Sequence, residues 1–116
     1  MKVQKWEAME RENMNPKMWR KLIYGERAML AQISIAKDGV VPLHHHESEQ
    51  LSYAVQGALK FELEGKEIVL RAGQVLVIPS NVPHSAVAIE DFLGFDVFSP
   101  IRVDWLTGND NYLRTK

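Results

Sequence analysis

The sequence contains no cysteine among its 116 residues. This absence excludes disulfide bridges, thiolate metal sites and cysteine nucleophiles, so histidine, carboxylate and amide groups remain as candidates for chemistry. Histidine is also scarce, with four copies in the chain. Three of them are consecutive, His44, His45 and His46, and the fourth is His84, so their clustering is the feature of the composition that needs an explanation.

An excess of basic residues is absent as well. Fourteen Lys and Arg stand against fifteen Asp and Glu, a formal net charge of −1, whereas binding to a phosphate backbone depends on many cationic contacts. The first twenty residues also lack the continuous apolar stretch of a signal peptide or a membrane span. We therefore expect no nucleic-acid partner, no membrane partner and a cytoplasmic location.

The chain does contain enough apolar residues for one packed core. Hydrophobic residues make up 46% and charged residues 25% of the sequence, which are ordinary values for a globular domain of this length. We expect one domain over residues 1–116. Its barrel core should lie at about 18–100, with an N-terminal arm or short helix at 1–17 and a polar C-terminal tail at 101–116 that turns at Gly108.

The middle of the chain has the pattern of short strands separated by turns. Within residues 28–36, for example, the apolar side chains share one parity, which is typical of a half-buried strand. Gly, Pro, Asn and Asp separate such segments at short intervals, and no segment is suited to be a crossover helix, so the pattern favours an antiparallel sandwich or barrel. The expected strands are 18–24, 28–36, 41–46, 50–56, 58–64, 67–70, 75–78, 84–89 and 92–98.

The histidine cluster is a candidate metal site. His44, His46 and Gln50 are all even-numbered, so in an extended segment their side chains leave the same face, whereas Glu49 points the other way. His84 would come from a distant strand placed beside this one. Three imidazoles and one neutral amide would leave a bound ion its full double positive charge, which makes it a strong Lewis acid and attracts anionic substrates.

A divalent ion held by such nitrogen and oxygen ligands could be Zn, Ni, Mn or Fe, and the sequence does not distinguish them. The alternative interpretation is that the three consecutive histidines form an exposed polar run and that His84 is a loop histidine whose hydrogen bonds are satisfied.

Two motifs resemble those of the cupin superfamily. The segment GVVPLHHHESEQLSYAVQG, residues 39–57, is similar to the first cupin motif, and GQVLVIPSNVPH, residues 73–84, is similar to the second. The resemblance implies a cupin-type antiparallel β-barrel, a double-stranded β-helix of jelly-roll type, with His44, His46, Gln50 and His84 as metal ligands. Three positions depart from the common motifs: Gln50 replaces Glu, Asn81 replaces Gly and Ala88 replaces Asn.

The segment FDVFSPIRVDWLTGNDNYLR, residues 95–114, resembles the C-terminal part of small cupins of the pectin-degradation type. Those enzymes act on 4,5-unsaturated uronate monosaccharides and speed the conversion of the ring form to the linear keto form. The resemblance implies that Asp96, Phe98 and Arg102 are active-site residues. Ile101 stands where a proline often precedes this arginine.

The same three residues have a physical interpretation of their own. Asp96 and Phe98 share a parity, so one strand face would present a carboxylate and an aromatic ring to the barrel interior. A buried carboxylate there could move a proton between enol and ketone carbons, and Arg102 could bind a substrate carboxylate through two parallel hydrogen bonds. Alternatively, Asp96 and Arg102 pair with each other or with the backbone at the barrel mouth, and Phe98 is a core residue.

Three functions are compatible with these features. The leading hypothesis is a metal-dependent, isomerase-like or lyase-like enzyme that opens 4,5-unsaturated uronates from pectin or alginate breakdown, with a small anionic sugar acid as its substrate. The second is a metal-dependent dioxygenase or another small-molecule oxidoreductase. The third is a non-enzymatic sensor or binding cupin, in which metal and pocket only hold a ligand.

A barrel of this size also has sheet edges to protect, which predicts a homodimer formed through a sheet edge or an exchanged N-terminal arm. Trp6, Trp19 and Trp105 lie outside the main run of strands. They either cap the ends of the barrel or belong to an arm that packs on a neighbouring subunit.

Overall fold

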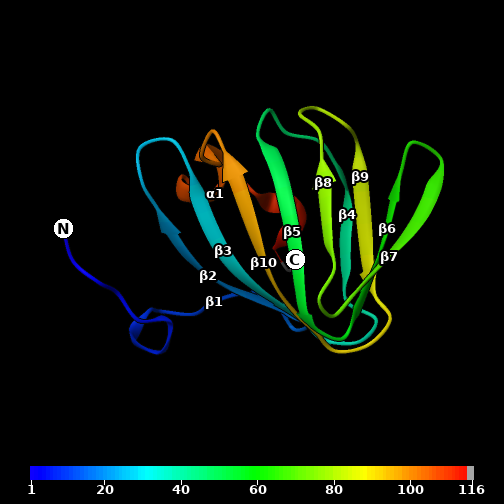
Figure 1. Ribbon diagram of the computed structural model, residues 1–116, viewed down its shortest axis with the longest axis horizontal. Coiled ribbons are helices and arrows are strands. Elements are labelled where there is room, and N and C mark those ends of the chain that lie inside the picture. The colour runs from blue at the N-terminus through cyan, green and yellow to red at the C-terminus, as the bar shows by residue number, and fades with distance from the viewer. Residues whose placement is uncertain (115–116) are drawn as a thin grey trace.

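The structure, a computed structural model, describes residues 1–114, and its strands form two sheets that enclose a barrel (Figure 1). In the order in which they pair, the strands of the larger sheet are β1 (Glu12–Asn15), β2 (Met18–Tyr24), β3 (Met29–Ile35), β10 (Phe92–Ser99), β5 (Glu49–Gln56) and β8 (Val75–Ile78). Those of the smaller sheet are β4 (Val40–His44), β9 (His84–Ala88), β6 (Ala58–Leu63) and β7 (Lys66–Arg71). Every pairing between them is antiparallel, so the predicted all-β antiparallel barrel is confirmed.

The alternation of apolar residues places the core between the two sheets. In β3 the side chains of Met29, Ala31, Ile33 and Ile35 are each at most 4% exposed, while the residues between them are half-buried. Such alternation buries one face of a sheet and leaves the other to solvent. All nine expected strands are present within two residues of their predicted ends, and the ends of β2 and β8 agree fully.

Gly57 permits the tight connection between β5 and β6, where the chain passes from the larger sheet to the smaller. Its φ is 79°, in the left-handed region, and a Cβ at this position would collide with the backbone carbonyl of Asp91. Glycine alone avoids both problems. This connection brings β5, which carries Gln50, close to the start of β6.

The N-terminal residues contain a short helix, which the sequence analysis allowed, and one strand that the sequence pattern did not indicate. A 3-10 helix, η1 (Trp6–Ala8), places Trp6 against Phe95 with ring centroids 5.6 Å apart. β1 follows within the expected arm and pairs with β2, which extends the larger sheet. No helix in residues 1–114 is both long and apolar enough to cross a membrane.

The C-terminal residues differ from the expected polar tail. Helix α1 (Val103–Leu106) and the 3-10 turn η2 (Asn111–Leu113) pack on the barrel, and the orange-to-red end of the chain in Figure 1 passes behind β10 and β5. The segment packs there because it carries apolar side chains: Trp105 and Leu113 are buried, at 6% and 2% exposure. Gly108 allows the turn between them with a φ of 75°. We define residues 102–114 as the C-terminal segment.

Candidate metal centre

The structure brings together the three histidines that the sequence analysis selected. His44 ends β4 and His84 begins β9, and the two lie opposite each other in the strand pairing. His46 follows in the loop between β4 and β5. One ligand nitrogen from each of the three lies within 4.8 Å of the others, a spacing that could hold a metal ion. His45, by contrast, is exposed.

His44, His46 and Gln50 lie close together as their shared parity predicted, but the premise of one extended segment does not hold. Residues 45–48 are not extended, because the chain leaves the smaller sheet after His44 and enters the larger sheet at Glu49. His44 and Gln50 therefore face each other from opposite sheets across the barrel interior, and His46 points inward from the loop between them. The convergence arises from this crossing and not from one continuous strand.

Backbone hydrogen bonds orient all three rings. Each histidine uses Nδ1 to donate to the carbonyl oxygen of the residue two positions earlier or later in the chain. The nitrogen–oxygen distances are 2.7 Å for His44 to Pro42, 2.8 Å for His46 to Ser48 and 2.8 Å for His84 to Val82. A neutral imidazole that donates through Nδ1 presents Nε2 with a free lone pair, which is the usual arrangement of a histidine ligand.

The three imidazoles are poised to be neutral at pH 7. Burial lowers the pKa of His44 to about 3, with further lowering by the nearby charges of His84 and Arg102. Burial also lowers the pKa of His46 to about 4, together with the charge of Arg102. The pKa of His84 is likewise lowered, chiefly by burial. A cation would therefore bind without first displacing protons from these nitrogens.

Gln50 completes a donor set that fits a metal ion. Its Oε1 lies 3.0 Å from Nε2 of His46, and both atoms are lone-pair acceptors when His46 is neutral and donates through Nδ1. Nε2 of His84 is buried and has no hydrogen-bond partner among the described residues. Converging acceptors of this kind are stabilised by a shared cation, and nitrogen and oxygen donors suit divalent transition ions.

A hydrogen-bonded chain links this amide to Asp96. Gln50 donates through its amide nitrogen to Ser52 Oγ at 2.9 Å, and Ser52 donates to Asp96 Oδ1 at 2.6 Å. Burial raises the pKa of Asp96 to about 6, against the lowering effects of the Ser52 hydrogen bond and the charge of Arg102. Asp96 is thus a carboxyl group whose pKa lies close to neutral pH, as proton transfer requires.

Arg102 is buried beside this carboxyl group but does not pair with it. Its Nε and Nη2 donate to the two carboxylate oxygens of Asp104 at 3.0 and 2.8 Å, and Nη2 also donates to the hydroxyl of Tyr112 at 2.7 Å. Burial lowers the pKa of Arg102, but the bonds to Asp104 and the influence of Tyr112 outweigh it and raise the pKa overall. Nη1 has no hydrogen-bond partner among the described residues.

Phe98 lies between the histidines and the arginine. Its side chain is 1% exposed, its ring meets that of His46 edge-on at 5.6 Å, and the guanidinium of Arg102 lies 5.1 Å from its centroid. The direct pairing of Asp96 with Arg102 that the alternative interpretation expected is not among the contacts of residues 1–114, whereas its prediction of a buried Phe98 is confirmed.

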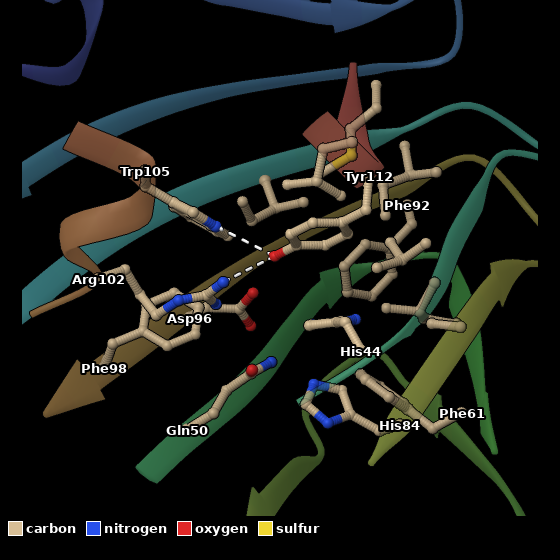
Figure 2. Close-up of a pocket in the computed structure, with 17 residues that line it drawn as sticks. His44, Gln50, Phe61, His84, Phe92, Asp96, Phe98, Arg102, Trp105 and Tyr112 are labelled. Atoms are coloured by element: carbon tan, nitrogen blue, oxygen red, sulfur yellow. Dashed lines mark hydrogen bonds between the residues drawn. The ribbon is translucent and has the colours of Figure 1, made fainter. Parts of the chain in front are cut away.

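One cavity of about 40 Å³ joins these groups (Figure 2). His44, Gln50, His84, Asp96 and Arg102 all line it. Ser52, Asp104 and Tyr112 also belong to this region, and the sequence pattern did not indicate them. The available signal for Tyr112 was the presence of Trp105, Tyr112 and Leu113 in a supposed tail, since such residues are seldom all left to solvent.

The fold is a β-barrel, and its cavity has a histidine-rich centre. Comparison with known proteins identifies the family to which such a barrel belongs. The cupin domain model matches residues 31–93, more than half of the chain, and the chain belongs to the cupin family. It is similar to the pectin degradation protein KdgF of Dickeya dadantii (strain 3937), with 28% identity over 98 residues that cover 82% of this chain and 89% of that protein.

Two further comparisons are informative. The solved structure of KdgF from Halomonas sp. matches with a TM-score of 0.80 and 34% identity, and the match covers 86% of this chain and 95% of that one. A 3-hydroxyanthranilate 3,4-dioxygenase from Rattus norvegicus is 24% identical over 101 residues, which are 81% of this chain and 34% of that longer protein.

Proposed function

We propose that this cupin is a metal-dependent enzyme that promotes ring opening and tautomerisation of 4,5-unsaturated uronate monosaccharides derived from pectin or alginate. One observation carries the proposal: two histidines and an amide, a carboxyl group with a raised pKa and a buried arginine line a single cavity, and His46 lies beside the two histidines. The similarity to two KdgF proteins, one of them described as a pectin degradation protein, supports the choice of substrate.

The metal ligands in this proposal are His44, His46, Gln50 and His84. A bound divalent ion would supply Lewis acidity toward the oxygen atoms of the substrate. The identity of the ion, whether Zn, Ni, Mn or Fe, is open, because nitrogen and oxygen donors accept all four.

Asp96 is proposed to carry the proton. Ring opening removes the proton of the hydroxyl on carbon 1 and breaks the bond between carbon 1 and the ring oxygen, which yields an aldehyde and an enolate. The enolate becomes a ketone when carbon 4 gains a proton. A single carboxyl group can take the first proton and return one to carbon 4, so the reaction balances without a co-reactant.

Arg102 and Phe98 are proposed to position the substrate. Nη1 of Arg102 is buried and unpaired among the described residues, so it is available to a substrate carboxylate through a charge-assisted hydrogen bond. Phe98 packs under the same guanidinium and limits its motion. Fixing the acid group in this way would hold carbons 1 and 4 within reach of Asp96.

The test is an assay with unsaturated galacturonate and unsaturated guluronate, using protein loaded in turn with each of the four metals. We expect absorbance of the conjugated double bond to fall faster than in buffer or with metal-free protein. If none of the four metals gives a faster reaction than buffer, the proposal is wrong.

A metal-dependent dioxygenase is the second candidate, and the similarity to the rat dioxygenase favours it. It requires a redox-active metal and consumption of oxygen. Turnover of the uronate under strictly anaerobic conditions with a redox-inert ion would decide for ring opening, whereas oxygen uptake with an iron-loaded sample would decide for the oxidoreductase.

We also propose that the protein forms a homodimer. Apolar side chains lie on the outer face of three adjacent strands of the larger sheet, β10, β5 and β8. Contiguous exposed apolar surface of this kind is typical of an interaction site. We define this outer sheet face by its exposed residues, Leu51, Tyr53, Val75, Val77 and Val97.

A further inference from the structure

The cavity is far smaller than a sugar-binding site. Its volume of about 40 Å³ compares with roughly 300 to 1,000 Å³ for typical small-molecule pockets, and with roughly 10 to 15 Å³ for a single buried water measured in the same way. The space beside the histidines therefore admits a few water molecules and not a monosaccharide. A side chain of the protein must occupy the place that such a ligand would need.

Tyr112 is that side chain (Figure 2). Its ring stacks on His44, with centroids 4.5 Å apart and an interplanar angle of 25°. Its hydroxyl oxygen accepts hydrogen bonds from Arg102 Nη2 at 2.7 Å and from Trp105 Nε1 at 3.2 Å. The tyrosine thus spans from a proposed metal ligand to the arginine proposed to bind an acid group.

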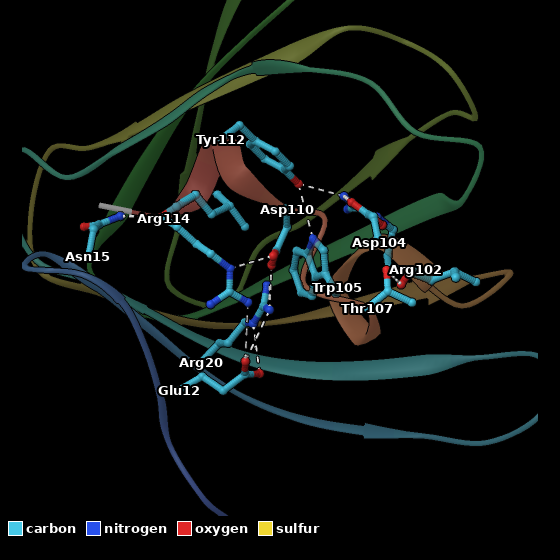
Figure 3. Close-up of polar contacts among 12 residues, drawn as sticks. Glu12, Asn15, Arg20, Arg102, Asp104, Trp105, Thr107, Asp110, Tyr112 and Arg114 are labelled. Carbon is cyan, nitrogen blue, oxygen red and sulfur yellow. Dashed lines mark hydrogen bonds and ion pairs between the residues drawn. The ribbon is translucent and has the colours of Figure 1, made fainter. Parts of the chain in front are cut away.

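A buried ion-pair network, separate from the cavity lining, holds the C-terminal segment in place (Figure 3). Asp110 pairs with Arg20 of β2 at 2.7 Å, and both side chains have no exposed surface. Arg114 donates to the other carboxylate oxygen of Asp110 at 2.8 Å. This anchor flanks Tyr112, with Asp110 two residues before it and Arg114 two residues after it. Displacement of the tyrosine therefore needs only a local change at η2 between two fixed points.

Arg102 would form a stronger hydrogen bond with a ligand carboxylate than it forms with Tyr112. The phenol oxygen is a neutral acceptor, whereas hydrogen bonds from guanidinium to carboxylate are charge-assisted and roughly twice as strong as neutral ones. A ligand with a carboxylate can therefore replace the tyrosine at Nη2. A neutral sugar offers only hydroxyl oxygens, which have no such advantage over the phenol.

We propose that Tyr112 closes the site in the free protein and selects for anionic ligands, because a sugar acid displaces it from Arg102 and His44 and a neutral sugar does not. The inference rests on the proposed function for the location of the site and the class of ligand. It adds a residue that determines specificity, and it makes the C-terminal segment part of the site.

Calorimetric titration of the zinc-loaded protein with galacturonate and with galactose tests the proposal. Tyr112→Phe keeps the ring but removes the neutral competitor at Arg102, so galacturonate should bind roughly 2- to 10-fold more tightly, the worth of one hydrogen bond. Galactose, which cannot form the charge-assisted bond, should remain the weaker ligand in both proteins. Tyr112→Ala removes the ring as well and should strengthen binding of both sugars. Tyr24→Phe, an exposed tyrosine at the end of β2, is the matched control and should change neither.

A loss of galacturonate affinity in Tyr112→Phe overturns the proposal. If Tyr112 were a contact of the bound ligand, Tyr112→Phe would weaken galacturonate binding, and unchanged or undetectable binding in every variant would equally exclude the displacement. A second measurement uses Trp105, whose indole nitrogen donates to the Tyr112 hydroxyl. In a Trp6→Phe, Trp19→Phe background, galacturonate should shift Trp105 emission and galactose should not; no shift with galacturonate counts against displacement.

Binding and ring-opening measurements together distinguish failure of the closing role of Tyr112 from failure of the proposed function. Tighter galacturonate binding by Tyr112→Phe together with no ring opening would support the closing role and exclude the enzyme. Ring opening by the wild type with weakened or unchanged galacturonate binding in Tyr112→Phe would support the enzyme and exclude the closing role.

Discussion

Asp96 is the residue on which the proposed chemistry depends most directly. Replacing it with Asn keeps the size and the contact with Ser52 but removes the group that takes and returns a proton. Turnover should fall roughly 100- to 10,000-fold, the usual contribution of general acid–base catalysis. Steady-state kinetics measure this loss, while metal content and galacturonate affinity should stay close to those of the wild type.

The pH dependence of the reaction rate is a separate test of the role of Asp96. The pKa of Asp96 is raised to about 6, so the carboxylate that accepts the first proton forms as pH rises through that value. The wild-type rate should increase across this range, and any residual Asp96→Asn rate should lack the increase. Glu62→Gln, an exposed carboxyl on β6, is the control. An Asn variant that keeps a tenth or more of the activity would exclude the role of Asp96.

Other residues show how far the sequence alone could lead. Residue type and spacing were enough to predict that His44, His46, Gln50 and His84 lie together, because few side chains can bind a metal and the motifs fix their separation. Ser52 carries no comparable signal, since serine is common on strands and its role depends on lying between Gln50 and Asp96 across two paired strands. Tertiary pairing, which spacing does not encode, decides such contacts.

At the scale of elements, the C-terminal segment depends on one buried charge pair. Burial alone would raise the pKa of Asp110, but the Arg114 hydrogen bond and the Arg20 charge outweigh it and lower the pKa below its ordinary value. This carboxylate therefore stabilises the fold fully above the pKa of the unfolded chain, and the contribution is lost as pH falls below it.

Asp110→Asn should destabilise the protein strongly, because it removes the fully buried charge partner of Arg20 and leaves only the partly exposed Glu12. Removal of one member of a buried pair typically costs about 3 to 5 kcal/mol, and urea unfolding at neutral pH measures the change in the free energy of unfolding. Glu67→Gln removes the exposed pair with Lys60 and should cost less than about 1 kcal/mol. Equal effects of the two substitutions would contradict an anchoring role.

The same scale shows why some elements were predicted and others were not. Strands such as β2 and β3 carry enough alternating residues to define both their face and their length. β1, α1 and η2 have three or four residues each, too few for a period to appear. The C-terminal segment was expected to be polar because most of its side chains are, yet Trp105 and Leu113 are buried against the barrel.

At the scale of the whole molecule, the two faces of the larger sheet have different partners. The inner face is covered by the smaller sheet and the C-terminal segment, and the outer face at β5, β8 and β10 has apolar side chains with substantial exposure. Val75 and Val77 are 57% and 52% exposed on β8, an edge strand of the larger sheet. An edge strand with exposed apolar residues favours association unless something covers it.

A second copy of the chain is the occupant that we propose for this face, with the same residues of each copy in contact around a two-fold axis. Sedimentation equilibrium at micromolar concentration should give twice the chain mass for the wild type. Val77→Lys places a charge in the proposed interface and should give the mass of one chain, with an unchanged circular dichroism spectrum. Val40→Lys alters a valine of similar exposure, 56%, on the smaller sheet, and should remain dimeric. A wild-type protein that sediments as a monomer would exclude the homodimer, and a dimer that persists in Val77→Lys but dissociates in Val40→Lys would move the interface to the smaller sheet.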